Sequence, residues 1–264
     1  MNLNNMTSLQ NLFTLKNKVA VVIGGGGYLC SEMAKGLALA GSSTIIIDKK
    51  IEKANHIAEN IKKEFNTKTL SIEANVAHKE DLKIALDKIL NVFSNVDILI
   101  NGAGINSPKK FLDITLEDWN AVMDSQITGT MLGCQVFGSN MIKNESGSII
   151  NISSASAGPP LSKAFAYSVA KAGIKNLTMN LAREWAKYNV RVNAIRPGFF
   201  PTEWNKKNFI TEEREAAILG HTPMNRYGKS KELIGAAIWL ASNSSSFVTG
   251  SEITIDGGFS CMTI

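Results

Sequence analysis

The sequence predicts an α/β fold in a single domain, with a doubly wound parallel sheet that carries helices on both faces. Short runs rich in Val and Ile recur along the chain, such as KVAVVI, STIIID and SIINIS, and such runs are typical of strands buried on both faces. Longer stretches with helical spacing separate these runs, so strands and helices alternate. Four glycines follow the first run directly. This order of strand, glycine turn and helix is typical of sheets that bind a nucleotide.

The elements follow one another regularly along the chain. We expect strands at residues 18–23, 44–47, 68–73, 96–100 and 190–195, and a last strand in GSEITIDGG. We expect helices from the glycines to Gly41, at 51–65, 79–93 and 231–241, and two helical stretches between 116 and 143. Residues 1–12 are polar, so we expect a flexible tail there and one domain over 13–264. A chain of 264 residues is long enough for a well-buried core.

The composition is ordinary for a soluble protein, and we expect this protein in the cytoplasm. Hydrophobic residues make up 44% of the chain and charged residues 19%, as in ordinary globular proteins. The net charge of +5 arises from interspersed charges and short Lys pairs, so we expect no nucleic-acid partner. No apolar run reaches membrane length, and the first residues lack a signal-peptide pattern, so we expect no membrane partner. Three cysteines and three scattered histidines fit no metal spacing, so we expect no metal and a reducing compartment.

Three polar residues stand at spacings that form one chemical unit. Tyr167 and Lys171 are four residues apart in an Ala-rich segment without Pro, so on a helix their side chains lie on one face. A neighbouring ammonium favours the phenolate, which predicts a Tyr167 pKa lowered toward neutrality and a role as general acid or base. Ser154 ends the run SIINISS, and a Gly-Pro-Pro loop follows it. We expect the strand end and the helix start to meet over one pocket, although a YxxxK pair alone is more often a solvated helix face.

With these three residues and the glycine run, the chain resembles the short-chain dehydrogenase/reductase family from Phe13 to its end. The resemblance implies a Rossmann domain that transfers a hydride between a nicotinamide cofactor and a carbonyl or secondary alcohol. It implies that Ser154 polarises the substrate oxygen, that Tyr167 transfers its proton, and that Lys171 tunes the Tyr and holds the nicotinamide ribose.

The chain departs from the family at the fourth catalytic position. The family has an Asn there, which kinks its helix and relays protons through water to the Lys, and this sequence has Gln126 in MDSQITGT. Gln keeps the amide but adds a methylene. The resemblance therefore implies that either Gln126 or a neighbour such as Ser125 serves in the relay.

The glycine run is the first candidate cofactor site. It lies where backbone N–H groups and a helix N-terminus bind a pyrophosphate, and a tight turn without ligand is the alternative. The family pattern TGxxxGxG has Gly where this chain has Tyr28 and Cys30. Alternatively, the run acts as GxGxxC, with the small Cys30 at the packing position. The candidate contacts in this segment are Gly24, Gly25, Gly26, Gly27, Tyr28 and Leu29.

Asp48 ends the second strand about 20 residues after the glycines, where a carboxylate accepts hydrogen bonds from the adenosine ribose and repels a 2′-phosphate. NAD is therefore favoured, although Lys49 and Lys50 leave NADP open. The resemblance supplies the remaining candidate contacts of the cofactor, besides Tyr167 and Lys171. These are Asn75 and Val76 near the adenine, Asn101, Gly102, Ala103 and Gly104 in the NGAG motif, and Pro197, Gly198, Phe200 and Thr202 in PGFFPT.

Substrate contacts are expected from three segments. The candidate substrate residues are Asn106, Ser156 and Trp204. Asn106 belongs to a polar loop for which simple exposure is an equal alternative. Residues 199–225 are longer than a minimal connection, so we expect a lid over the substrate. Lys206 and Arg226 are candidate partners of a substrate carboxylate, although surface solvation is the more common role of a single cation.

The glycine run followed by Leu-Cys, the Phe-Phe pair and the DGGF segment resemble the branch of the family that acts on sugar acids, with its gluconate 5-dehydrogenases and fructuronate reductase-like proteins. We therefore expect an NAD(P)-dependent enzyme acting on a sugar acid, keto-sugar or polyol. A 3-oxoacyl thioester reductase and a catalytically silent cofactor-binding protein remain as alternatives. The FVTG and DGG segments resemble those through which family members form homotetramers, so we expect a homotetramer or a homodimer.

Overall fold

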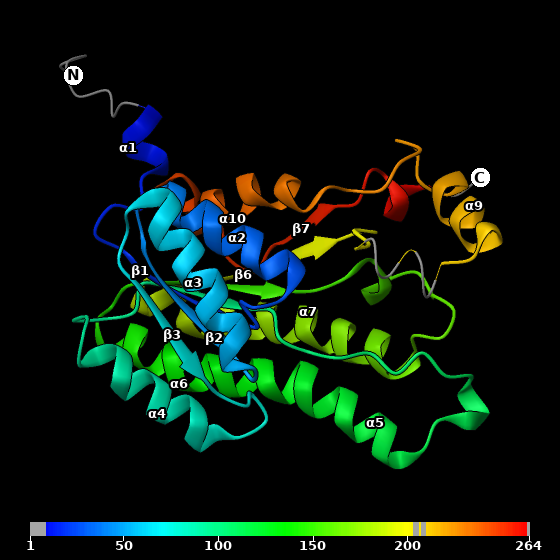
Figure 1. Cartoon of the computed structure of the whole chain (residues 1–264), viewed down its shortest axis with the longest axis horizontal. Coiled ribbons are helices and arrows are strands. Elements are labelled where there is room, and N and C mark those ends of the chain that lie inside the picture. The colour runs from blue at the N-terminus through cyan, green and yellow to red at the C-terminus, as the bar shows by residue number, and fades with distance from the viewer. Residues whose placement is uncertain (1–8, 203–205, 207–209, 263–264) are drawn as a thin grey trace.

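The structure is a computed structural model that describes residues 9–202, 206 and 210–262. Its centre is a seven-stranded sheet in the order β3-β2-β1-β4-β5-β6-β7, and every neighbouring pair is parallel (Figure 1). The strands are β1 Val19–Ile23, β2 Ser43–Asp48, β3 Thr69–Glu73, β4 Ile98–Asn101, β5 Gly147–Ile152, β6 Val190–Pro197 and β7 Glu252–Ile255. The predicted doubly wound α/β class is confirmed.

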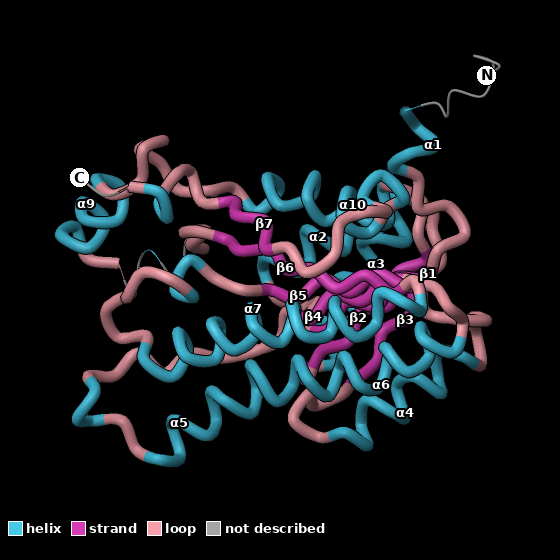
Figure 2. The backbone as a smooth tube through the Cα atoms, turned by 180° about the vertical axis from the view of Figure 1, so that it is seen from behind, coloured by secondary structure: helices cyan, strands magenta, loops and turns pink. Residues whose placement is uncertain are grey.

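Helices cover both faces of this sheet. Figures 1 and 2 show α2, α3 and α10 on one face and α4, α6 and α7 on the other. The described helices are α1 Leu9–Phe13, α2 Tyr28–Leu39, α3 Ile51–Phe65, α4 Lys79–Leu90, α5 Leu116–Met123, α6 Gly129–Lys143, α7 Phe165–Trp185, α9 Glu212–Gly220 and α10 Ile234–Ala241. The alternation of strand and helix therefore follows the predicted order.

Two apolar cores result from this layering, because successive residues of a strand point to opposite faces of the sheet. Val22 belongs to a buried cluster with Met33 and Leu37 of α2. Its neighbour Val21 belongs to a separate cluster that includes Phe137 of α6. Every residue of β1 is buried, as the continuous apolar run predicts.

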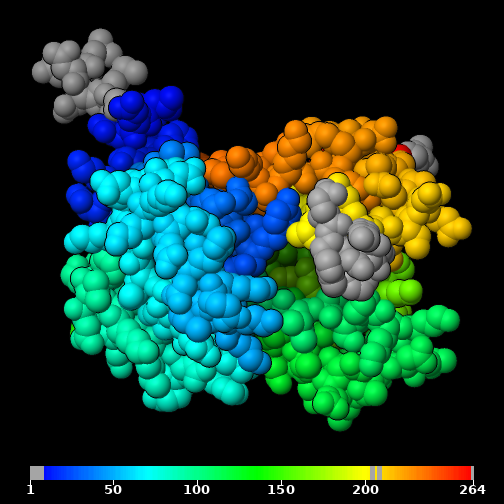
Figure 3. Space-filling model, in the orientation of Figure 1, coloured from blue at the N-terminus to red at the C-terminus, as the bar shows by residue number. Residues whose placement is uncertain are grey.

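The sheet order reverses at β1, and this reversal positions the site. Val21 pairs with Ile45 of β2 on one side and with Leu99 of β4 on the other. In such sheets a crevice opens beyond the carboxyl ends of the strands at the point of reversal, and ligands bind there. Figure 3 shows a hollow in this face between the blue atoms of the α2 region and the green atoms of the chain around α5.

Two features differ from the sequence prediction. The first helix begins at Leu9, inside the predicted tail, because the Thr14 N–H donates to the Gln10 carbonyl at 2.9 Å and Leu15 is buried. Residues 1–8 of that tail lie outside the described part of the chain. The 116–143 stretch contains the two predicted helices, but a π-helical turn at Asp124–Thr128 joins them. Such turns often occur at functional sites.

Candidate active site

The glycine run forms a tight turn between β1 and α2. The N–H groups of Gly24 and Gly25 both donate to the Ile47 carbonyl of β2, at 2.8 and 3.1 Å. Gly24 has a φ of +74°, and a Cβ there would lie 2.7 Å from the Ala103 backbone, so only glycine fits. Helix α2 begins at Tyr28 without a side-chain cap, which leaves the amides of its first turn for an anion. The turn therefore fits the pyrophosphate of a dinucleotide.

Asp48 lies beside this turn at the end of β2. Its Oδ2 accepts from the Gly26 N–H at 3.1 Å, and its Oδ1 accepts from the Lys50 N–H at 3.0 Å. A Cβ on Gly26 would lie 2.8 Å from Asp48 Oδ2, so the glycine allows the carboxylate to approach the turn. The carboxylate is thus held next to the pyrophosphate position, where an adenosine ribose lies in folds of this kind.

Cys30 and Gly102 explain how the turn works without the family's third glycine. Cys30 is buried, and its thiol occupies the place that a side chain on Gly102 would fill. Burial raises the pKa of the Cys30 thiol to about 12, so it packs as a neutral group. Cys30 on α2 is larger than glycine, and it fits because Gly102 after β4 has no side chain. This geometry agrees with the second interpretation of the sequence, in which Cys30 takes the packing position.

The other candidate cofactor residues have structural partners of their own. Asn101 Nδ2 donates to Asn151 Oδ1 at 2.9 Å, and Asn151 donates to the Thr178 hydroxyl of α7, also at 2.9 Å. This buried network ties β4 and β5 to α7. Asn75 Oδ1 accepts from the Ala77 N–H at 3.2 Å and so stabilises the turn after β3.

Val76 and the PGFFPT residues are held by packing and by a backbone hydrogen bond. Val76 is buried, and a Cβ on Gly129 would lie 2.7 Å from it. The Gly198 N–H donates to the Ile255 carbonyl of β7 at 2.9 Å. Phe200 lies against Gly228, where any side chain would overlap its ring. Pro197 closes β6, and Thr202 is half-buried after it.

Ser154, Tyr167 and Lys171 come together where β5 ends and α7 begins. Ser154 hydrogen-bonds with the Tyr167 hydroxyl, and its Oγ also accepts from the Ser156 N–H at 3.2 Å. Lys171 lies one turn beyond Tyr167 and is 4% exposed. Its Nζ donates to the Ile152 carbonyl at 2.6 Å and lies 5.4 Å from the centre of the Tyr167 ring. The strand end and the helix start meet as the sequence predicts.

The sequence prediction of a lowered Tyr167 pKa is wrong for this structure. Burial raises the pKa of Tyr167, and the hydrogen bond with Ser154 opposes that rise only in part. Burial also lowers the pKa of Lys171 from 10.5 to about 8. The ammonium donates its short hydrogen bond to Ile152 and not to the phenol. Tyr167 is therefore protonated at neutral pH, the form required of a proton donor.

Gln126 lies on the π-helical turn and is 3% exposed. Its Nε2 donates to the Ile105 carbonyl at 2.9 Å, while the Ile105 N–H donates to Ser125 Oγ at 3.3 Å. Gly104 has no room for a side chain because the Gln126 amide lies against it. Gln126 and Ser125 thus bind the carbonyl and the N–H of Ile105. Ile105 begins the loop of residues 105–110, which carries Asn106 and is called the substrate loop below. The proton relay predicted for Gln126 stays a prediction.

Gln126→Leu is expected to raise the KM for substrate by about 10-fold, because the Ile105 carbonyl loses a buried donor whose removal costs roughly 1–3 kcal/mol. The kcat should change less. Steady-state kinetics of this variant and of Ser125→Ala, which removes the acceptor of the Ile105 N–H, should give the same pattern. A fall in kcat at unchanged KM for Gln126→Leu would instead support the relay.

The substrate loop is held at a second point. Asp118 accepts from the Ser107 hydroxyl at 3.4 Å and from the Lys109 ammonium at 2.6 Å. Lys109 and Thr115 lower the pKa of Asp118 to about 2, so it stays ionised. Asn106 lies between the two fixed points and is exposed, which leaves its amide accessible to a polar substrate.

Of the two other candidate substrate residues, the structure describes Ser156 but not Trp204, and it describes part of the lid. The Ser156 hydroxyl donates to Ser154 Oγ at 3.1 Å, so Ser156 lies inside the catalytic group. Trp204 lies outside the described residues. Within the lid, α9 is tied to the loop after Ser154, because Arg214 Nη1 donates to the Ser162 hydroxyl at 3.1 Å.

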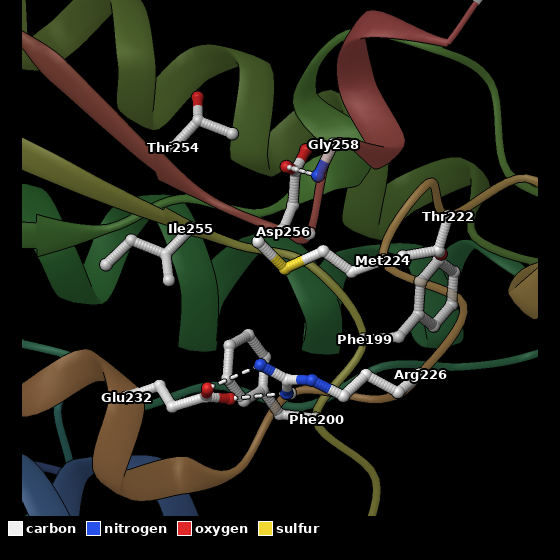
Figure 4. Close-up of a pocket in the computed structure, with 12 residues that line it drawn as sticks. Phe199, Phe200, Thr222, Met224, Arg226, Glu232, Thr254, Ile255, Asp256 and Gly258 are labelled. Carbon is white, nitrogen blue, oxygen red and sulfur yellow. Dashed lines mark hydrogen bonds and ion pairs between the residues drawn. The ribbon is translucent and has the colours of Figure 1, made fainter.

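A cavity of about 340 Å³ lies between the end of β6, the end of the lid and the turn after β7 (Figure 4). Figure 4 shows Arg226 and Glu232 at its wall, joined by two contacts of 2.9 and 2.7 Å. Arg226 lowers the pKa of Glu232 to about 2, so both groups are charged. Arg226 is therefore already paired with a carboxylate of its own chain, which argues against its predicted pairing with a substrate carboxylate. None of the three catalytic candidates lines this cavity.

Several residues around the site were not singled out by the sequence. Ser153, Arg196 and Glu252 form a buried polar cluster beside Ser154, and Asn151 joins the network under the sheet. The sequence pattern that could have indicated these residues is a polar residue within or next to an apolar strand run. Among the described residues, no group of His, Cys, Asp and Glu could hold a metal ion, and no helix is long and apolar enough to cross a membrane.

Known proteins are similar to this chain over most of its length. The short-chain dehydrogenase model described as Enoyl-(Acyl carrier protein) reductase matches residues 29–260. The uncharacterized oxidoreductase UxuB of Bacillus subtilis (strain 168) is 40% identical over 266 residues, which cover 93% of this chain and 95% of that protein. The chain belongs to the short-chain dehydrogenase/reductase family. As a member of this family it is an NAD(P)-dependent oxidoreductase.

Two further members of the short-chain dehydrogenase/reductase family are similar throughout. The 2-dehydro-3-deoxy-D-gluconate 5-dehydrogenase of Formosa agariphila is 36% identical, over 94% of each chain. The crystal structure of a gluconate 5-dehydrogenase from Burkholderia cenocepacia J2315, in complex with NADP and tartrate, has a TM-score of 0.91 and 30% identity. The match covers 96% of this chain and 99% of the chain in that crystal structure.

Proposed function

We propose that this oxidoreductase moves a hydride between nicotinamide and the carbonyl or secondary alcohol of a sugar acid, a keto-sugar or a polyol. The observation that carries the chemistry is the contact between Ser154, Tyr167 and Lys171 at the carboxyl edge of the sheet. The glycine turn and the uncapped start of α2 lie at the same edge. The substrate class is supported by the similar enzymes of Formosa and Burkholderia, both named for gluconate-type acids.

The protein's part in carbonyl reduction is to position the substrate oxygen and to supply a proton. A bound nicotinamide supplies the hydride. Ser154 donates a hydrogen bond to the oxygen, and Tyr167, protonated at neutral pH, transfers its proton as negative charge develops there. Lys171, held at the Ile152 carbonyl, stabilises the phenolate that remains. In alcohol oxidation the proton moves in the opposite direction.

NAD is the proposed cofactor. The amides in the first turn of α2, directly after the glycine turn, would hold the pyrophosphate, and the Asp48 carboxylate would hold the adenosine ribose. Asp48 is kept in place by two backbone N–H groups, so a 2′-phosphate would meet a fixed negative charge. Lys50 donates its backbone N–H to Asp48. Its ammonium group is a feature beside Asp48 that would favour NADP instead.

We propose a cytoplasmic homotetramer or homodimer. Apolar side chains lie exposed along α7 and its surroundings, among them Leu112 at 95%, Val169 at 49% and Phe165 at 42%. Apolar groups gathered in this way favour burial against a second copy. The terminal strand β7 pairs with β6 alone in the described sheet.

Cys30 and Cys134 are buried free thiols, which suits a reducing compartment, and cell fractionation tests that placement.

The function is tested with the purified protein in three steps. Fluorescence titration with NADH and NADPH is expected to give tighter binding of NADH. Turnover is then measured on a panel of aldonates, keto-acids of sugars, polyols and 3-oxoacyl thioesters, with the highest kcat/KM expected on a sugar acid or its keto form. Light scattering is expected to give a multiple of the 28.6 kDa chain mass. Turnover of thioesters alone, or binding without turnover of any class, would contradict the proposal.

A further inference from the structure

The residues on either side of Ser154 are held by a buried cluster outside the catalytic group. The Ser153 hydroxyl donates to Glu252 Oε1 at 2.6 Å. On the other side of Ser154, the Ala155 carbonyl accepts from Arg196 Nη2 at 3.0 Å. Ser154 is therefore the single residue between two anchored neighbours, where the chain leaves β5 in an extended conformation.

The two anchors are joined by an ion pair. Arg196 Nη1 lies 3.4 Å from Glu252 Oε2, and the side chains are only 10% and 9% exposed. They come from adjacent strands, since Arg196 is on β6 and Glu252 is on β7, where its register partner is Ala194. Residues two apart on a strand point to the same face, so the register brings the two charges together.

This cluster leaves little freedom to the loop after Ser154. A Cβ on Gly158 would lie 2.6 Å from Arg196 Nη2, so the loop passes directly over the guanidinium. Burying two charges is costly unless both are paired and hydrogen-bonded. A buried ion pair such as Arg196 and Glu252 is expected beside a side chain whose position must be fixed accurately, here that of Ser154.

We propose that Ser153, Glu252 and Arg196 are positioning residues, which hold the Ser154 hydroxyl at Tyr167 by fixing the residues before and after it. The inference rests on the proposed function in one respect: Ser154 acts on the substrate oxygen. Displacing the hydroxyl would weaken both its contact with the substrate and its hydrogen bond with Tyr167. Errors of about 1 Å in such groups lower rates by up to about 100-fold.

The decisive comparison is between Ser153→Ala and Ser148→Ala. Ser148 is a matched control, since it is a buried serine of β5 whose hydroxyl donates to the Leu240 carbonyl at 2.7 Å, far along the strand from Ser154. Both variants lose one buried hydrogen bond. Ser153→Ala is expected to lower kcat by about 10-fold or more while NADH binding stays unchanged, and Ser148→Ala is expected to leave kcat within about twofold.

Two further readouts separate positioning from general destabilisation. The hydrogen bond with Ser154 lowers the pKa of Tyr167, so the pH profile of kcat in Ser153→Ala should move to higher pH, whereas that of Ser148→Ala should not. Crystal structures of both variants should show Ser154 Oγ displaced only in Ser153→Ala. This structural readout does not depend on turnover, so a failure of the proposed function is told apart from a failure of this inference.

The charged residues of the cluster are tested by two variants that both affect the Glu252 carboxylate. Glu252→Gln removes the charge opposite the buried Arg196 and should lower kcat as Ser153→Ala does. Lys175→Met removes an exposed cation that lies 3.5 Å from the same carboxylate, and it should leave kcat unchanged. If Glu252→Gln does not fold, Ser153→Ala decides. Equal kcat and an unmoved Ser154 Oγ in Ser153→Ala and Ser148→Ala would overturn the proposal.

Discussion

Tyr167→Phe is expected to lower kcat by about 1,000-fold, within the range that a positioned proton donor contributes. The change removes a single oxygen from a half-buried side chain. The ring, which lies 5.4 Å from the Lys171 ammonium, stays in place. The affinity for NADH should therefore remain within about twofold of the original protein, because no contact proposed for the adenosine or pyrophosphate is altered.

The measurement is a comparison of single-turnover rates and of NADH fluorescence for the two proteins. Tyr188→Phe is a suitable control, since Tyr188 lies just beyond the end of α7 that is far from the site. It should leave both quantities unchanged. Turnover by Tyr167→Phe at the original rate would show that the proton comes from another group.

Lys171→Met is expected to reduce turnover by at least about 100-fold and, at the same time, to make the protein more stable near pH 7. A pKa depressed from 10.5 to about 8 corresponds to roughly 3 kcal/mol of penalty on the charged form. Loss of the donor to the Ile152 carbonyl returns about 1–2 kcal/mol of that. The net gain should be about 1–2 kcal/mol, seen as a rise in Tm of a few degrees.

The pH dependence of this gain has a definite sign. Lys171 binds its proton less tightly in the folded state than in the unfolded state, so the folded protein carries the full penalty below pH 8. The penalty fades as pH rises from about 8 to about 10.5, because the unfolded lysine then loses its proton as well. The difference in denaturation free energy between the variant and the original protein should shrink over that interval. A difference that is constant with pH would mean that the burial of Lys171 is not costly.

Much of the fold and of the catalytic group follows from local sequence patterns. The run VAVVI, buried at every position, and the four-residue spacing of Tyr167 and Lys171 are set within a few residues, where periodicity determines which side chains share a face. The meeting of Ser154 with Tyr167 needed only a short loop between a strand and a helix.

The features that the sequence did not predict depend on residues far apart in the chain. The Arg196 and Glu252 pair requires the register of β6 against β7. The raised pKa of Tyr167 depends on burial by surrounding elements, which outweighs the neighbouring amine. The π-helical turn that places Ser125 and Gln126 against Ile105 has no distinct pattern in MDSQITGT.

The interlocking of Cys30 with Gly102 couples the mutations that the two positions tolerate. A side chain at position 102 would meet the Cys30 thiol, so such a change requires the thiol to move or position 30 to become smaller. Cys30→Gly alone would leave a gap in a closely packed region and cost stability. A side chain at position 102 is therefore expected to cost least when position 30 becomes smaller at the same time, so we expect the two positions to change as a pair.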